Sequence, residues 1–160
     1  MALTNAALRR AFRAPVLLYH WRCGWILGHR FLLLIHTGRR TGRRRETILE
    51  IMEFRIAPDE MVVMSGFGRN ADWLRNIQAN PRIELMVGSR RFAATCRLLD
   101  AAEAATVVAG YERRCRWLGR IIRAVLTRLL GWRYDGSEAS RRRLVAQLPL
   151  VAFRPIADPG

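Results

Sequence analysis

The twelve residues HTGRRTGRRRET, at positions 36–47, place five arginines and two glycines directly after the apolar run FLLLI. Arginine side chains make charge-assisted and often bidentate bonds to phosphate and carboxylate oxygens. Gly38 and Gly42 allow a tight turn that exposes backbone N–H groups, and Thr37 and Thr41 add hydroxyl donors. The stretch therefore predicts an anion-binding loop, with a solvated basic turn as the alternative. A Walker-type phosphate loop is excluded, because the lysine is missing and a strand is expected to follow.

A second stretch, SGFGRNADWLRNIQANP at residues 65–81, combines a glycine loop with a short amphipathic segment. Ser65 is expected at the end of a strand, and Trp73 and Asn76 on a short helix. Trp73 is equally compatible with a place in the core, and Asn76 with a helix cap or a clamp on neighbouring backbone.

The remaining reactive residue types form no recognisable constellation. Cys23, Cys96 and Cys115 include no C-x-x-C pair, and the three histidines lack metal-site spacing. We therefore expect no disulfide framework and no metal site, and we expect reduced thiols in a cytoplasmic protein. The sequence shows neither a catalytic triad nor a pair of acidic residues, so it does not indicate nucleophilic or acid–base catalysis.

Together, the two stretches resemble the deazaflavin-dependent nitroreductase family. HTGRRTGRRRETIL is followed, after a predicted hairpin, by MSGFGRNADWLRNIQANPRIELMVG, and LPLVAFRP is similar to the family's closing strand. The family pattern is T-G-R-K/R-S/T-G-x-x-R, then a strand ending in serine and glycines, then D-W-Y-x-N-L-x-A-N-P. The resemblance covers about residues 31 to 99. It implies a split β-barrel and coenzyme F-420, a deazaflavin with a phosphodiester and a polyglutamate tail; flavin mononucleotide (FMN) is the alternative cofactor.

The resemblance also implies a set of cofactor-binding residues. The basic loop would bind the phosphate and the tail, the following strand would line one side of the cofactor, and the next strand end would face the ring. The short helix would close the groove. In that order, the residues are Arg39, Arg40, Thr41 and Arg45; Glu46, Thr47, Ile48, Leu49 and Glu50; Val63, Met64, Ser65 and Gly66; and Asp72, Trp73 and Asn76.

The implied reaction is hydride transfer from the reduced deazaflavin to a small-molecule acceptor, and the cofactor supplies that chemistry. A quinone, a nitro compound and an activated double bond all remain open as acceptors. Glu50 stands where one type of relative has a tyrosine, and Tyr111 and Tyr134 lie in no alignable context. We therefore assign no catalytic residue. A cofactor-binding or membrane-surface protein without reductase activity is the alternative.

Hydrophobic periodicity and turn residues predict the elements. Strands are expected at residues 30–36, 46–55 (with a bulge), 61–65, 82–88, 90–99 and 148–155. Helices are expected at residues 4–13, 15–27, 72–79, 100–114 and 115–132, and a polar connection at 135–143. Asn70 or Asp72 is the expected cap of helix 72–79, and Asp100 with Glu103 forms an approximate capping box.

Strands that come as hairpins predict an α+β fold with a mostly antiparallel sheet or small barrel. The resemblance specifies a split β-barrel, similar to pyridoxamine-phosphate oxidase, with flanking helices. We expect a single domain over residues 1–160. Residues 1–28 would form N-terminal helices, and residues 100–146 a helical insertion before the last strand.

The net charge is +15, and all 28 basic residues are arginine, which indicates anionic partners or a G+C-rich genome. No specific nucleic-acid-binding module is present. The basic segment 113–133 has apolar residues at helical spacing, which fits either a helix packed on the barrel or contact with an anionic membrane surface. No stretch is long enough to span a membrane. We expect a cytoplasmic protein, as a monomer or homodimer, with peripheral contact to the inner membrane face as a further hypothesis.

Overall fold

The computed structural model describes residues 30–156. The helices expected at 4–13 and 15–27 lie outside this range. The elements in chain order are β1 (Phe31–Thr37), β2 (Arg44–Ile56), β3 (Asp59–Met64), the 3-10 turn η2 (Gly68–Asn70), α4 (Asp72–Ala79), β4 (Ile83–Val87), β5 (Arg90–Leu98), α5 (Ala101–Arg114), the 3-10 turn η3 (Arg116–Leu118), α6 (Gly119–Leu130), α7 (Glu138–Gln147) and β6 (Leu150–Pro155).

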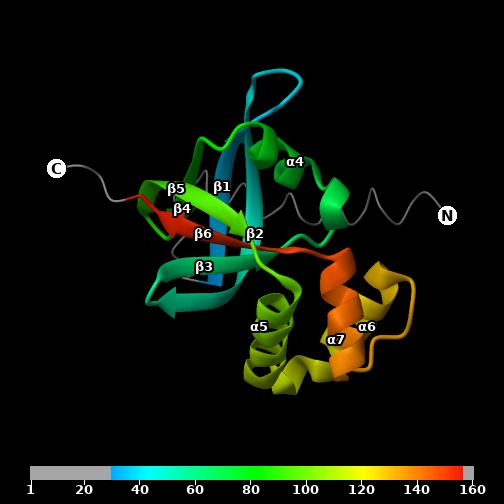
Figure 1. The fold of residues 1–160 in the computed structure, drawn as a ribbon. Coiled ribbons are helices and arrows are strands. Elements are labelled where there is room, and N and C mark those ends of the chain that lie inside the picture. The colour runs from blue at the N-terminus through cyan, green and yellow to red at the C-terminus, as the bar shows by residue number, and fades with distance from the viewer. Residues whose placement is uncertain (1–29, 157–160) are drawn as a thin grey trace.

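The six strands form a closed antiparallel barrel in the order β1-β2-β3-β6-β5-β4, which confirms the predicted fold class (Figure 1). β1 closes the barrel by pairing with β2 on one side and β4 on the other. The predicted bulge in β2 is confirmed by a register shift against β3 between Ile51 and Glu53. Such a shift bends the strand, which lets β2 run from the loop of arginines to the far end of the barrel.

Alternate strand residues fill the barrel, because successive side chains in a strand point to opposite faces. Leu32 and Leu34 of β1 and Val151 and Phe153 of β6 belong to this core. Helix α4 adds Trp73 to the same core, and its ring centroid lies 6.4 Å from that of Phe153. The core thus fixes α4 against the barrel.

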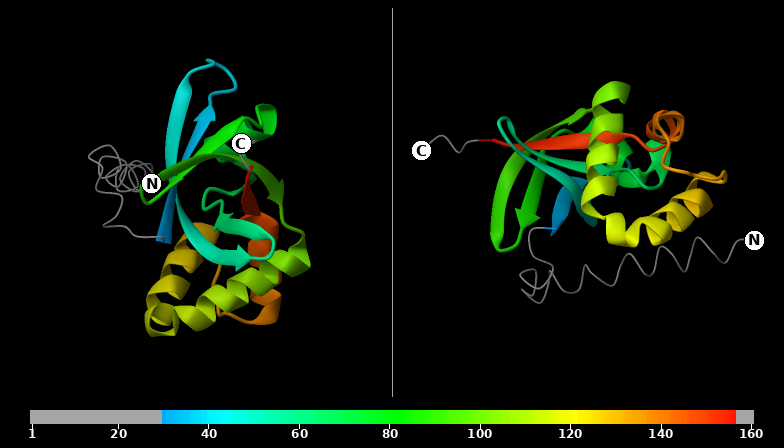
Figure 2. Two further views of the ribbon diagram at one scale, coloured as in Figure 1. Left: turned by 90° about the vertical axis from the view of Figure 1, so that its left-hand side faces the viewer. Right: turned by 90° about the horizontal axis from the view of Figure 1, so that it is seen from below.

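Helices α5, α6 and α7 gather at one end of the barrel (Figure 2). α5 and α7 bury apolar residues against the outward-facing residues of β3 and β6, in a second core that includes Val108, Leu144 and Tyr134. Helix α6 contains no buried residue. Its Leu126 and Leu130 are partly buried against the second core. One face of α6 therefore remains available to line a cavity or to meet a partner.

Two local predictions are wrong. The segment 135–143, expected as a polar connection, contains the start of α7, which Ser137 caps by accepting a hydrogen bond from the Ser140 backbone N–H. The helix is held by the burial of Leu144 and Val145 rather than by an amphipathic pattern in its polar first turns. Helix α4 is capped by neither Asn70 nor Asp72, because its N-cap residue is Ala71. At α5, Asp100 does accept from the Glu103 N–H, as predicted.

An ion-pair network crosses four neighbouring strands on the outside of the barrel. The buried carboxylate of Glu60 in β3 accepts from Arg55 of β2, Arg97 of β5 and Arg154 of β6. Glu103 of α5 joins the same network through Arg55 and Arg97. These arginines therefore hold the strand order together and tether the first turn of α5.

Candidate functional site

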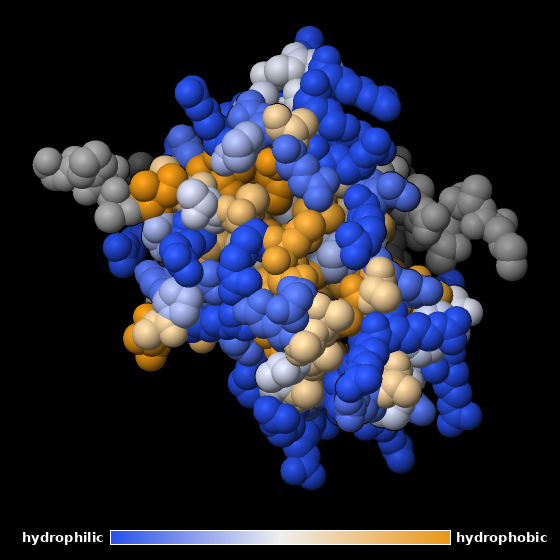
Figure 3. Space-filling view, viewed as in Figure 1, coloured by the Kyte–Doolittle hydropathy of each residue, from blue (hydrophilic) through white to orange (hydrophobic). Residues whose placement is uncertain are grey.

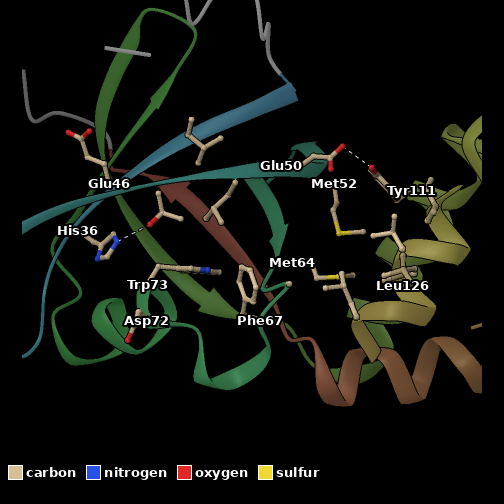
Figure 4. A pocket seen from close by; sticks show the side chains of 18 of the residues that line it. His36, Glu46, Glu50, Met52, Met64, Phe67, Asp72, Trp73, Tyr111 and Leu126 are labelled. Carbon is tan, nitrogen blue, oxygen red and sulfur yellow. Dashed lines mark hydrogen bonds between the residues drawn. The ribbon is translucent and has the colours of Figure 1, made fainter. Parts of the chain in front are cut away.

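A cavity of 830 Å³ lies between the barrel and the helices, alongside β2. That volume is within the range of small-molecule and cofactor sites. One end is polar and is formed by β2 and α4; the other is apolar and is formed by α5 and α6 (Figure 4). In the space-filling view, hydrophobic residues gather near the centre of one face, where the barrel meets the helices, and hydrophilic residues surround them (Figure 3).

The polar end of the cavity is lined by His36, Arg45, Thr47, Asp72 and Asn76. Trp73 lies among them and supplies a flat apolar wall (Figure 4). Arg45 is exposed, and no carboxylate among residues 30–156 forms an ion pair with it. An exposed guanidinium at the rim of an apolar slot can bind the anionic part of a ligand whose ring enters the slot.

Arg39 anchors the basic loop to α4. Its guanidinium donates to the Asp72 carboxylate at 3.1 Å and to Asn76 Oδ1 at 2.8 Å, and its backbone N–H donates to the same Asn76 oxygen at 3.1 Å. Asn76 is therefore a clamp on neighbouring backbone, one of the alternatives left open by the sequence. The guanidinium of Arg39 is therefore held against α4 and does not itself line the cavity.

The expectation that the basic loop exposes its backbone N–H groups is wrong for most of them. The N–H of Gly38 donates to the Arg43 carbonyl, and those of Thr41 and Gly42 donate to the Gly38 carbonyl. The N–H of Arg43 donates to the Thr41 hydroxyl. Because the loop closes on itself, its cationic side chains, rather than a nest of amides, are what it offers to an anion. The tight turn itself is confirmed, since Gly42 has φ +64°.

His36 lies 4% exposed behind the polar end of the cavity. Its Nδ1 is 3.2 Å from Asn76 Nδ2, and its Nε2 is 3.3 Å from Thr47 Oγ1. Burial, followed by the positive charge of Arg45, lowers the pKa of His36 from 6.5 to about 4. The imidazole is consequently neutral around pH 7 and able to act as one donor and one acceptor.

The opposite wall carries a tyrosine–glutamate pair. The Tyr111 hydroxyl of α5 donates to Glu50 Oε1 of β2 at 2.7 Å, and Arg30 Nε donates to the same oxygen at 3.1 Å (Figure 4). Burial, together with the hydrogen bond to Glu50, raises the pKa of Tyr111. The pair bridges the barrel and α5 and places a neutral phenol at the wall of the cavity.

The structure brings eleven of the sixteen expected site residues to the cavity. They are Arg45, Glu46, Thr47, Ile48, Leu49, Glu50, Met64, Gly66, Asp72, Trp73 and Asn76. Arg39, Arg40 and Thr41 lie in the loop beyond its polar end. Val63 is buried in the barrel core, and Ser65 is buried with its hydroxyl donating to the Gly68 carbonyl at 2.7 Å.

The apolar end of the cavity was not expected from the sequence. Met52, Phe67 and Val108 line it together with one face of α6, formed by Ile121, Ile122, Val125, Leu126 and Leu129. The signal for α6 was present as apolar residues at helical spacing, but the spacing gives no indication of what that face meets. His36 and Tyr111 were visible as residue types, and only the fold places them at the cavity.

The barrel has the split-barrel fold of proteins related to pyridoxamine 5′-phosphate oxidase. An FMN-binding protein of that type from Nostoc punctiforme has 16% identity and a TM-score of 0.50, covering 91% of this chain and 81% of its own. A protein of unknown function from Agrobacterium tumefaciens has 11% identity and a TM-score of 0.51, covering 79% and 48%. An F-420-H2 dependent reductase, FDR-A, has 17% identity and a TM-score of 0.44, covering 79% and 96%.

The sequence assigns the family. The model of the F-420H(2)-dependent quinone reductase family matches residues 21–123, and this chain belongs to that family. It is therefore an oxidoreductase whose family uses coenzyme F-420, as the resemblance implied. No curated protein sequence matches the chain.

Among residues 30–156, no helix has the length and hydropathy needed to cross a membrane. No group of three or more histidine, cysteine, aspartate or glutamate side chains in that range is arranged to hold a metal ion.

Proposed function

We propose that this chain binds reduced F-420 along β2 and transfers its hydride to a small apolar acceptor in the end of the cavity lined by α6. The observation that supports this assignment is one cavity with a cationic rim at one end and an apolar wall at the other. A quinone is the first candidate, given the family, and a nitro compound or an activated double bond the others. When bound, the deazaflavin supplies the hydride.

The residues present fit that cofactor. Trp73 and the backbone of Glu46–Glu50 bound a slot for a flat ring, with Met64 and Gly66 on the adjoining wall. Arg45 at the start of β2, with Arg40 of the adjoining basic loop, provides positive charge for the phosphodiester and glutamates. Four further residues would not contact the cofactor themselves. Arg39 and Thr41 would shape the basic loop, and Val63 and Ser65 would shape the end of β3. The apolar end excludes water from the acceptor, which favours hydride transfer over side reactions.

The proposed function is tested by binding and turnover. Oxidised F-420 should bind purified protein at micromolar concentration with a change in its fluorescence. The reduced cofactor should then be oxidised in the presence of a naphthoquinone, a nitroaromatic or an enone, and the rates would rank the three acceptor classes. Tight binding of FMN without any response to F-420 would contradict the proposal and indicate a flavin-dependent activity instead.

Arg45→Gln should weaken F-420 binding about tenfold, because a charge-assisted hydrogen bond to the tail would be lost. The dependence of the dissociation constant on salt should become shallower in the same variant. Arg90→Gln removes the same charge from an exposed position that does not line the cavity, and is the matched control. The deazaflavin riboside, which lacks the tail, should bind wild type and Arg45→Gln equally. A similar loss with the riboside would contradict the assignment of Arg45 to the tail.

A second proposed property is contact of α6 with an anionic membrane surface. Ile121 and Val125 of α6 are 60% and 51% exposed and recur every four residues with Leu129, so the three form one stripe along the helix. Trp117 of the preceding turn η3 is 79% exposed. Arg116, Arg120, Arg123 and Arg128 are exposed on the same segment. An exposed apolar stripe flanked by arginines is typical of a helix that lies in a lipid interface. Because Ile121 and Val125 also line the cavity, an apolar acceptor could enter directly from the lipid.

Wild-type protein should float with phosphatidylglycerol-containing vesicles at low salt and stay at the bottom with pure phosphatidylcholine. Trp117→Ala should reduce the floating fraction several-fold, since indole anchors at the interface. Ile56→Ala, at a still more exposed apolar residue at the end of β2, should leave it unchanged. Wild type that stays at the bottom in both cases, or a homodimer in lipid-free sedimentation that Trp117→Ala dissociates, would identify the stripe as something other than a lipid contact.

A further inference from the structure

The orientation of the Asn76 side chain is fixed by donors on one side. Its Oδ1 lies 3.1 Å from the Arg39 backbone nitrogen and 2.8 Å from Arg39 Nη1, and both groups can only donate. The side-chain oxygen must therefore face Arg39, because the amide NH₂ in its place would set donors against donors. The NH₂ group then faces His36, whose Nδ1 lies 3.2 Å away.

This orientation selects the tautomer of His36. Nδ1 has to accept the Asn76 hydrogen bond, so the single proton of the neutral ring resides on Nε2. Nε2 lies 3.3 Å from Thr47 Oγ1, to which it donates. A neutral ring is what the lowered pKa of His36 requires. The chain of bonds thus runs in one direction, from Arg39 through Asn76 and His36 to Thr47.

The direction of that chain decides what Thr47 can offer. A hydroxyl has one hydrogen to donate, and His36 uses only an acceptor position of Thr47 Oγ1, so the Thr47 hydrogen stays available. No second hydrogen bond of the Thr47 hydroxyl is formed within residues 30–156. Thr47 and His36 both line the cavity, and His36 lies at the end that holds Trp73 (Figure 4). The hydroxyl is therefore set as a donor toward a ligand in the slot.

We propose that His36 is a positioning residue that commits the Thr47 hydroxyl to donate a hydrogen bond to an acceptor atom of the bound deazaflavin ring, a carbonyl oxygen or a ring nitrogen. This inference rests on the proposed function, and it adds a contact that fixes the ring's orientation against the apolar end of the cavity.

The tautomer is tested first, without cofactor. In ¹⁵N-labelled protein at pH 7, the imidazole of His36, assigned by its loss in His36→Gln, should show a protonated Nε2 and an unprotonated Nδ1. The opposite tautomer, or rapid exchange between the two, would overturn the proposal. This measurement does not depend on whether the chain binds F-420.

The donor role is tested by titrating oxidised F-420 into a cycle of variants. Thr47→Val keeps the shape of the side chain and should weaken binding about tenfold, whereas Thr47→Ser should bind within about twofold of wild type. His36→Leu should weaken binding by a similar factor, and His36→Gln, which keeps one donor and one acceptor, should restore most of it. In the Thr47→Val background, His36→Leu should cause no further loss, because its effect acts through the hydroxyl.

Three results would go against the proposal, and they are distinguishable. Unchanged binding by Thr47→Val would overturn the donor role alone. If His36→Leu weakened F-420 binding as much in the Thr47→Val background as in wild type, His36 would act on the fold and not through Thr47. The melting temperature of each variant would show whether the fold is destabilised. Absence of F-420 binding by wild type would overturn the proposed function together with this inference.

Discussion

Replacing Glu60 by alanine should lower the free energy of unfolding by about 3 kcal/mol, which is a large part of the stability of a domain of this size. Glu60 is 1% exposed, and its two oxygens accept from three guanidinium groups at 2.8 to 3.3 Å. Hydrogen bonds from Arg97, and secondly from Arg154, hold the pKa of Glu60 below its usual value. Without the carboxylate, these positive charges would repel one another across β2, β3, β6 and β5.

Urea denaturation at pH 7 would measure this loss. Arg154→Gln is the matched control, because the Arg154 side chain is half exposed and Glu60 keeps Arg55 and Arg97 as partners. We expect it to cost less than about 1 kcal/mol, as is usual for an exposed ion pair. Equal losses in the two variants would mean that the Arg154 ion pair accounts for the whole effect and that Glu60 is not the centre of the network.

The sequence predicted the strands well because each strand carries its own signal. The apolar runs of β1, β3 and β6 and the rough alternation of β2 can be read locally, and Gly88-Ser89 marks the turn between β4 and β5. The order of strands around the barrel is a different matter. Nothing in the sequence of β3 indicates that β6, about ninety residues later, is its neighbour. The network around Glu60 depends on that neighbour and was therefore not predictable from the residues alone.

The arginines of the basic loop show the same limit at the candidate site. Arg39 and Arg45 have the same side chain in the same stretch, residues 36–47, and no feature of the sequence distinguishes their roles. In the fold, Arg39 meets Asp72 and Asn76 of α4, whereas Arg45 stays exposed at the rim. The difference arises because packing of Trp73 on Phe153 fixes α4, and with it the two partners of Arg39. Roles within a motif thus follow from an element that lies outside it.

The helical part of the site was the least accessible to sequence reasoning. The stripe of α6 was recognised as apolar, and the choice between packing on the barrel and facing a partner stayed open. The structure shows an intermediate arrangement, in which Leu126 and Leu130 pack on the second core while Ile121 and Val125 stay exposed beside the cavity. Apolar residues at helical spacing predict that a helix has an apolar face. How far that face of α6 is buried depends on how much of it α5 and α7 cover.

Acid should destabilise this protein between pH 6.5 and about pH 4 through His36 alone, by about 3 kcal/mol in total. In the unfolded chain the imidazole takes up a proton near pH 6.5, whereas in the folded chain burial and Arg45 delay protonation to about pH 4, against the smaller opposing effect of Asp72. The unfolded state therefore binds more protons in this window. The stabilising contribution is complete above pH 6.5 and is lost as the pH falls to about 4.

His36→Gln removes the titrating group while keeping one donor and one acceptor. The unfolding free energy of wild type minus that of this variant should therefore fall steadily from pH 7 to pH 4.5. Glu60 and Glu103 do not confuse the result. Their pKa values are lowered from 4.5, that of Glu103 to about 2 by Arg97 and Arg55, so the stability they contribute is lost only at lower pH. Urea midpoints at several pH values would measure the difference. A difference that is constant across the window would mean that His36 titrates in the folded protein as it does in the unfolded chain, and that burial and Arg45 do not lower its pKa.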